Sequence, residues 1–323
     1  MDNRVLLLEH PACGLHDPGP GHPEGQDRLR ALLDAVESDR LLGSRLERRT
    51  AAPATDRELL RVHTPEHVAR VRAAAHAAEE GGACLWLDED TPVSGRSWEA
   101  ALAAAGCATS AADAVADGAA AAAFALTRPP GHHASADRAM GFCLFNNVAV
   151  AVRHLQARGA AERVLIVDVD AHHGNGTQEV FYEDPSVYVL SLHLSPHFPH
   201  TGAAAERGAG RGWGTTRNVP LPPGTTGAAY RARFLDAVED ALSAFTPDLV
   251  FASVGLDCLE GDPEGGLRLA PDDLHQLTCE LRDRLPPHAR RRFVGVLEGG
   301  YAVDRIGPGL VNVLRALAGL PRA

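Results

Sequence analysis

An apolar run that we expect to be a buried strand ends in residues that could bind a metal ion. The segment VLIVDVDAHHGNG (164–176) places Asp168, Asp170 and His172 directly after four apolar residues. If the strand continues through them, their two-residue spacing puts all three side chains on the same side. Neighbouring buried carboxylates are unfavourable unless a cation or hydrogen-bond donors satisfy them. An Asp, a His and a third carboxylate from a distant part of the chain form a ligand set that is typical of catalytic zinc sites. Asp257, in VGLDCLEGD, is the best placed third ligand.

Polar residues also follow the other apolar segments that we expect to be strands. They are RPPGHH after 121–127, DVDAHHGNG after 163–167, HLSPHFPHTG after 187–192, LDCLEGDPEGG after 249–255 and EGGY after 293–297. In open α/β sheets, sites form outside the carboxyl ends of the strands, so these segments should converge on one edge. A simpler interpretation, in which Asp168 and Asp170 cap a helix while His172 and His173 are solvated, does not explain this convergence.

Strands and helices alternate along the chain and position these segments. The helix at 64–82 has clear boundaries, with Thr64 as N-cap, Pro65 in the first turn and a glycine pair at its end. The glycine-rich segment 205–218 is predicted to be a loop. The alternation indicates a mostly parallel sheet with helices on both faces, and without a linker or repeat we expect residues 1–323 to form a single domain. The other helices are predicted at 26–38, 97–118, 147–159, 226–245, 271–285 and 304–318. Strands are predicted at 4–10, 163–170 and 186–194, and strands that run into loops at 121–133, 247–257 and 292–301.

The composition restricts the partners of the protein. The chain of 323 residues has a net charge of −11, and its 31 basic residues are all arginine. This balance disfavours nucleic acids and anionic membranes, and no apolar run approaches the length of a transmembrane helix. The six cysteines form no CxxC pair and the N-terminal apolar run is too short for an export signal, which favours the cytoplasm. The pattern does not report an oligomeric state, so a homo-oligomer stays open.

The motifs together resemble the arginase/deacetylase superfamily, in its histone deacetylase and acetylpolyamine amidohydrolase branch. The similarity extends from HPEGQDRLRAL (22–32) to LEGGY (297–301), and HHGNG and LEGGY are more similar to the class II enzymes than to class I. It implies a three-layer α/β domain around an eight-stranded, mostly parallel sheet. The remaining motifs that carry it are RPPGHHA (128–134), GFCLFNN (141–147), DVDAHHGNGTQ (168–178), SLHLSPHFPHTG (191–202) and GLDCLEGDPEGG (255–266).

The resemblance implies two cation sites at the strand end described above. Asp170, His172 and Asp257 match the family's zinc ligands. Iron(II) could occupy the same ligands in cells, because metal availability often decides selection. The family's structural potassium site, formed mostly by backbone carbonyls, matches Asp168, Asp170, His172, Ser191 and Leu192.

The resemblance also implies a pair of catalytic histidines, His132 and His133. Asp168 matches the carboxylate that orients His132. Asn175 matches the partner of His133, where class I enzymes have a second Asp. Because a carboxylate raises the pKa of a histidine far more than an amide does, we expect His132 to be protonated more readily and His133 to be the neutral general base.

Four further residues match the family's substrate-binding and catalytic positions. Tyr301 matches the tyrosine whose hydroxyl polarises the scissile carbonyl. Phe142 and Phe198 match the aromatic walls of a narrow tunnel that holds the stem of a linear amine. Asp90, in LDEDTPVSG, resembles the rim carboxylate that binds the substrate N–H, although the loop is divergent and Asp88 is an alternative.

The expected reaction is metal-assisted hydrolysis of an amide, which releases acetate or another short acid and a free amine. Glu264 departs from the class II pattern, which has Leu there, and matches a gatekeeper of the family's polyamine deacetylases. A carboxylate at the tunnel mouth attracts a second cationic amine, which favours acetylpolyamines over acetyl-lysine proteins. Three other functions are weighed against this one: a protein lysine deacylase, a non-enzymatic binding module and an arginase-like ureohydrolase.

Overall fold

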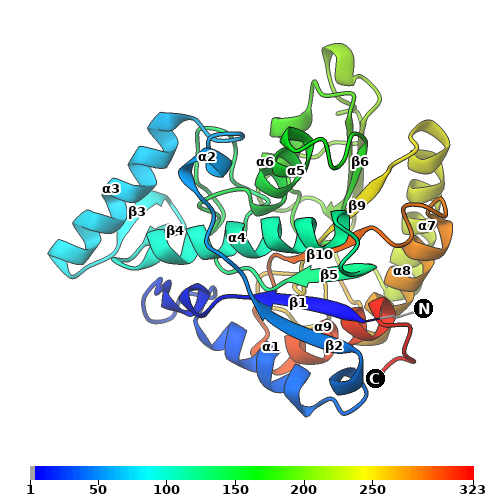
Figure 1. The fold of residues 1–323 in the computed structure, drawn as a ribbon, viewed down its shortest axis with the longest axis horizontal. Coiled ribbons are helices and arrows are strands. Elements are labelled where there is room, and N and C mark those ends of the chain that lie inside the picture. The colour runs from blue at the N-terminus through cyan, green and yellow to red at the C-terminus, as the bar shows by residue number, and fades with distance from the viewer. Residues whose placement is uncertain (1–3) are drawn as a thin grey trace.

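The computed structural model describes residues 4–323 and contains an eight-stranded sheet in which every neighbouring pair of strands is parallel (Figure 1). The order is β2-β1-β5-β10-β9-β6-β7-β8, so the predicted α/β class and sheet are confirmed. A separate antiparallel hairpin is formed by β3 (Leu85–Asp88) and β4 (Thr91–Val93). The strands of the large sheet are β1 (Val5–Glu9), β2 (Leu46–Thr50), β5 (Ala122–Ala125), β6 (Val164–Asp168), β7 (Val187–Leu194), β8 (Thr216–Leu221), β9 (Leu249–Val254) and β10 (Phe293–Leu297).

Helices cover both faces of the sheet and complete three layers (Figure 1). The central strands β5, β6, β9 and β10 consist entirely of buried residues, as expected for a parallel sheet covered on both sides. No helix within residues 4–323 is long and apolar enough to cross a membrane. One layer contains α1 (Asp27–Ser38), α9 (Val303–Leu317), α8 (Pro271–Arg284) and α7 (Gly227–Ala244), in contact in that order; the other contains α2 (Asp56–Leu59), α3 (Pro65–Gly81), α4 (Ser97–Ala116), α5 (Asn147–Ala157) and α6 (Asn175–Phe181).

Both edge strands of the sheet lie outside the strands predicted from sequence. β2, with sequence LERRT, is half-buried to exposed and carries three charges, so it lacks the apolar pattern of a strand. β8 begins inside the segment 205–218 that is predicted to be a loop, so this prediction is wrong for residues 216–218. Charged residues and proline are common on edge strands, since they hinder pairing with another sheet, and Arg217 and Pro220 give β8 this character.

The carboxyl ends of the central strands meet at one edge of the sheet. Asp168 at the end of β6 lies opposite Ser253 of β9, and Val254 of β9 lies opposite Leu297 of β10. The loops that follow β5, β6, β9 and β10 therefore leave the sheet side by side. This arrangement brings together the polar segments identified in the sequence.

Candidate active site

The loop after β6 holds its polar side chains by turns rather than by strand geometry. β6 ends at Asp168, so the prediction of a strand continuing to residue 170 is wrong. Asp168 Oδ1 accepts the N–H of Asp170 at 3.1 Å, and Asp170 Oδ1 accepts the N–H of His172 at 2.8 Å. Each carboxylate therefore fixes the backbone two residues ahead of it, as in an Asx-turn. The three side chains stay close together through these bonds and not through a two-residue strand period.

Asp170, His172 and Asp257 form a buried cluster that fits a metal ion. One candidate ligand atom from each residue lies within 4.8 Å of the others. The Nδ1 atom of His172 is 3.0 Å from Asp170 Oδ1 and 3.2 Å from Asp257 Oδ2. One N–H cannot satisfy two carboxylates fully, whereas a shared cation would. Burial, followed by repulsion from Asp170, raises the pKa of Asp257 to about 7, as expected for two carboxylates without a cation between them. Two carboxylates and one imidazole suit catalytic zinc.

Backbone N–H groups hold the remaining carboxylate oxygens of this cluster. Asp257 Oδ1 accepts from Ala171 at 2.8 Å, and Asp170 Oδ2 accepts from Gly299 at 2.9 Å. A Cβ atom at position 299 would lie 2.2 Å from Asp257 Oδ2. The glycine after Glu298 is therefore required for this close approach, and the backbone orients both carboxylates toward the proposed metal position.

The two histidines after β5 have the two different partners that the sequence indicates. His132 Nδ1 lies 2.9 Å from Asp168 Oδ2, and His133 Nδ1 lies 2.7 Å from Asn175 Oδ1. Burial lowers the pKa of His132, but the charges of Asp170 and Asp168 more than offset this and raise it to about 10. Burial and the neighbouring charge of His132 hold the pKa of His133 well below its ordinary value.

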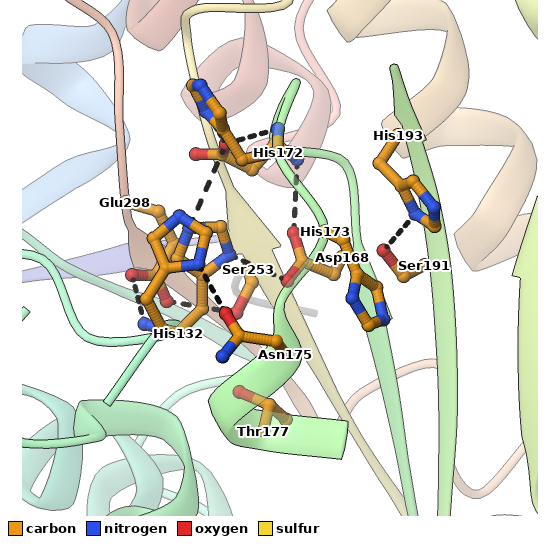
Figure 2. A network of polar contacts seen from close by, with 12 residues as sticks. His132, Asp168, His172, His173, Asn175, Thr177, Ser191, His193, Ser253 and Glu298 are labelled. Atoms are coloured by element: carbon orange, nitrogen blue, oxygen red, sulfur yellow. Dashed lines mark hydrogen bonds and ion pairs between the residues drawn. The ribbon is translucent and has the colours of Figure 1, made fainter. Parts of the chain in front are cut away.

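Glu298 is a buried part of this site that sequence reasoning did not single out, although it lies in the LEGGY motif. Its Oε2 atom accepts the N–H groups of Gly131 at 2.7 Å and His132 at 3.1 Å. Its Oε1 atom accepts the hydroxyl of Ser253 at 3.0 Å (Figure 2). Burial raises the pKa of Glu298 to about 7, against the opposing charge of His132. The end of β10 is thereby joined to the backbone of the histidine pair.

Replacing Glu298 by alanine should lower both stability and turnover. Two buried N–H groups would lose their acceptor, and each unsatisfied group costs about 1–3 kcal/mol. Urea unfolding and kcat measure the two effects. Glu298→Gln keeps an oxygen for Gly131 and His132, so it should retain most of the stability, while Glu239→Ala, on an exposed face of α7, is the control. Wild-type stability and kcat in Glu298→Ala would show that these bonds are unimportant.

The loop that carries Tyr301 is fixed from two sides. Asp262 Oδ2 accepts the N–H of Tyr301 at 2.7 Å and that of Ala302 at 2.8 Å. The buried guanidinium of Arg28 lies 4.7 Å from the centre of the Tyr301 ring and donates to the carbonyls of Gly300 and Glu298. Burial raises the pKa of Tyr301 well above its ordinary value, so the hydroxyl stays protonated and can donate a hydrogen bond. Asp262 was not among the predicted site residues.

The two predicted aromatic walls lie beside His133 and Tyr301. The rings of Phe142 and Tyr301 meet edge to face with centres 5.6 Å apart, and Phe198 meets His133 in the same way at 5.2 Å. Phe142 has a left-handed backbone with φ of 67°, a conformation that is rare outside glycine. Asp90 Oδ1 accepts the N–H of Gly141 at 3.1 Å, so this carboxylate holds the loop that presents Phe142. The side chain of Asp88, the alternative, accepts one hydrogen bond among residues 4–323, from the N–H of the adjacent Glu89.

Glu264 is tied to the metal cluster through a histidine that sequence reasoning did not assign to the site. His197 stacks on the ring of His172, with centres 4.8 Å apart, and its Nε2 atom lies 3.0 Å from the carbonyl oxygen of Glu264. Glu264 itself is half-buried. A stacked imidazole leaves no sequence signature, because the contact joins two loops on different strands.

The predicted potassium site remains a prediction. Ser191 of β7 lies opposite Asp168 of β6, so the backbone places these two residues together. The Ser191 hydroxyl is 2.9 Å from His193 Nδ1 (Figure 2), and the Leu192 carbonyl accepts the hydroxyl of Tyr230 at 3.4 Å.

Comparisons with known proteins agree with this geometry. The histone deacetylase domain matches residues 22–317. A histone deacetylase-like amidohydrolase from Pseudomonas aeruginosa is 40% identical over 317 residues, which cover 98% of this chain and 80% of that protein. A probable deacetylase from Archaeoglobus fulgidus is 37% identical, covering 94% and 83% of the two chains. The crystal structure of the HDA15 HD domain superposes with a TM-score of 0.92 and 36% identity, over 100% of this chain and 90% of that one. This chain belongs to the histone deacetylase family.

Proposed function

We propose that the protein is a zinc-dependent amidohydrolase that removes acetyl or another short acyl group from a linear amine. The observation that carries the proposal is the buried Asp170–His172–Asp257 cluster beside the His132–His133 pair. Bound there, zinc would polarise the acyl carbonyl and lower the pKa of water. Structural potassium and a cytoplasmic location, without nucleic acid or membrane partners, are further parts of the proposal.

The protein's own groups divide the proton transfers between them. Because Asn175 Oδ1 accepts from His133 Nδ1, the Nε2 atom of neutral His133 is left free to take the proton of water. His132 stays charged beside Asp168. The Tyr301 hydroxyl donates to the oxyanion that forms at the carbonyl. A protonated histidine then delivers a proton to the leaving amine.

Glu264 favours an acetylated polyamine as the substrate. Its backbone carbonyl contacts His197, which stacks on His172, and this supports a position of the residue close to the metal cluster, where its carboxylate would attract a second amine. The alternative, an acetyl-lysine in a protein, is supported by the family match, whose name refers to histone substrates. The two candidates differ in whether the charge of Glu264 contributes to recognition.

The deciding experiment measures kcat/KM for N8-acetylspermidine and for an acetyl-lysine peptide, on zinc-loaded and metal-stripped protein. If Glu264 is the gatekeeper, Glu264→Leu should reduce the polyamine value by about tenfold or more and leave the peptide value nearly unchanged, since one lost ion pair near a low-dielectric site is worth about 1.4 kcal/mol. Glu260→Leu, in the same loop but exposed and paired with Arg268, is the matched control.

A preference for the peptide that Glu264→Leu does not change would assign the protein to the lysine deacylases. No gain of activity on adding zinc to the stripped protein would contradict the metal-dependent mechanism itself. If the zinc-bound protein hydrolyses neither substrate, both substrates are excluded, while the proposal of a zinc-dependent hydrolase acting on another amide stands.

A further inference from the structure

A cavity of about 310 Å³ lies at the edge strand β8, away from the catalytic residues. We call it the β8 cavity. Arg207 from the preceding loop, Arg217 from β8 and Arg233 from α7 all line it. Its other lining residues within the described chain are uncharged, and they include Tyr188, Thr216 and Asn218. The cavity therefore combines cations from three elements without an acidic residue in its wall.

Two of these three arginines lack a carboxylate partner. Arg217 pairs with Asp240 of α7. The guanidinium groups of Arg207 and Arg233 are exposed and form no ion pair with any residue in the range 4–323. The unpaired charge leaves the cavity suited to an anion.

The buried wall of the cavity also contains polar atoms without a partner. Thr216 is 2% exposed, and its hydroxyl has no hydrogen-bond partner among residues 4–323. The same is true of the Arg217 Nε–H group on the next residue. Buried donors are normally satisfied, because leaving one unpaired costs free energy. Neighbouring residues of a strand point to opposite faces, so one anion would not meet both donors; held by Arg207 and Arg233, it would accept from the Thr216 hydroxyl, a residue that lines the cavity.

We propose that the β8 cavity binds a small phosphate monoester. Guanidinium groups bind phosphate oxygens through paired, charge-assisted hydrogen bonds, and a dianion matches two unpaired arginines. The volume suits a small molecule, and Tyr188 and Val219 offer apolar surface to an organic substituent. This proposal does not depend on the deacylase reaction.

The first test is titration calorimetry with phenyl phosphate, with a linear alkyl hydroxamate occupying the zinc site of the holoenzyme. The expected result is one site with a dissociation constant below about 1 mM. Arg207→Ala and Arg233→Ala should each weaken binding by about tenfold, while Arg211→Ala, an exposed arginine of the same loop outside the cavity, should leave it unchanged. Benzoate, a monoanion with the same ring, should bind more weakly than phenyl phosphate.

A second variant separates a binding role from simple charge attraction. Thr216→Val removes the buried hydroxyl and keeps the side-chain shape, so it should raise the melting temperature of the ligand-free protein and weaken phenyl phosphate binding. Absence of phenyl phosphate binding up to about 10 mM would overturn the proposal. Equal losses in the Arg207, Arg233 and Arg211 variants would also overturn it, because the attraction would then be non-specific.

Discussion

Replacing His133 by alanine should reduce kcat by about 10²–10⁴-fold, the range for loss of a general base. His133 is the only one of the two paired histidines whose pKa is held below its ordinary value, so at neutral pH it alone can accept a proton. Steady-state kinetics with an acetylated amine would measure the loss. Zinc content should remain at the wild-type level, because His133 is not a proposed ligand.

The exposed His76 on α3 provides the control, since His76→Ala removes an imidazole far from the site. Added imidazole should restore part of the kcat of His133→Ala. A variant with near-normal kcat and full zinc content would assign the proton transfer to another group.

Replacing Tyr301 by phenylalanine should reduce kcat by about 10²–10³-fold, comparable to the loss of one donor to an oxyanion. The ring would keep its contacts with Phe142 and Arg28, so the fold and KM should change little. The effect should appear in kcat because the hydroxyl binds the charge that develops during the reaction. Pre-steady-state acetate release would show whether the chemical step is the one that slows.

Tyr182→Phe is the matched control, because it removes the same hydroxyl from a half-buried tyrosine outside the site. If both variants retain wild-type kcat, the oxyanion is stabilised without Tyr301. If only KM rises in Tyr301→Phe, the hydroxyl binds the substrate and not the charge that develops on it.

The sequence was most informative where a residue's chemistry conflicts with its surroundings. Asp168 and Asp170 at the end of an apolar run require a cation or hydrogen-bond donors, and that requirement predicts Asp257 as a third ligand. The boundaries of α3 were equally predictable, because Thr64 accepts the N–H of His67 and Gly82 ends the helix in a left-handed conformation.

Other features left no such signal. Glu298 accepts hydrogen bonds from the backbone N–H groups of Gly131 and His132. Every residue except proline carries such a group, so the sequence does not indicate which ones this carboxylate contacts. β8 was missed because its exposed edge tolerates arginine and proline, which hides the strand pattern. The β8 cavity depends on three arginines from separate elements, and their spacing in the chain does not indicate that they meet.

The backbone bonds to buried carboxylates have a consequence for how this protein could diversify. Asp170, Asp257, Asp262 and Glu298 all accept N–H groups from the loops at the sheet edge. These bonds fix the loops of the candidate site rigidly, so we expect few substitutions to be tolerated there. Glu264 and the β3–β4 hairpin, which we propose to form the rim of the site, are attached through fewer bonds of this kind. New substrate preferences should therefore arise by exchange of rim residues, while the hydrolytic chemistry beneath them is inherited intact.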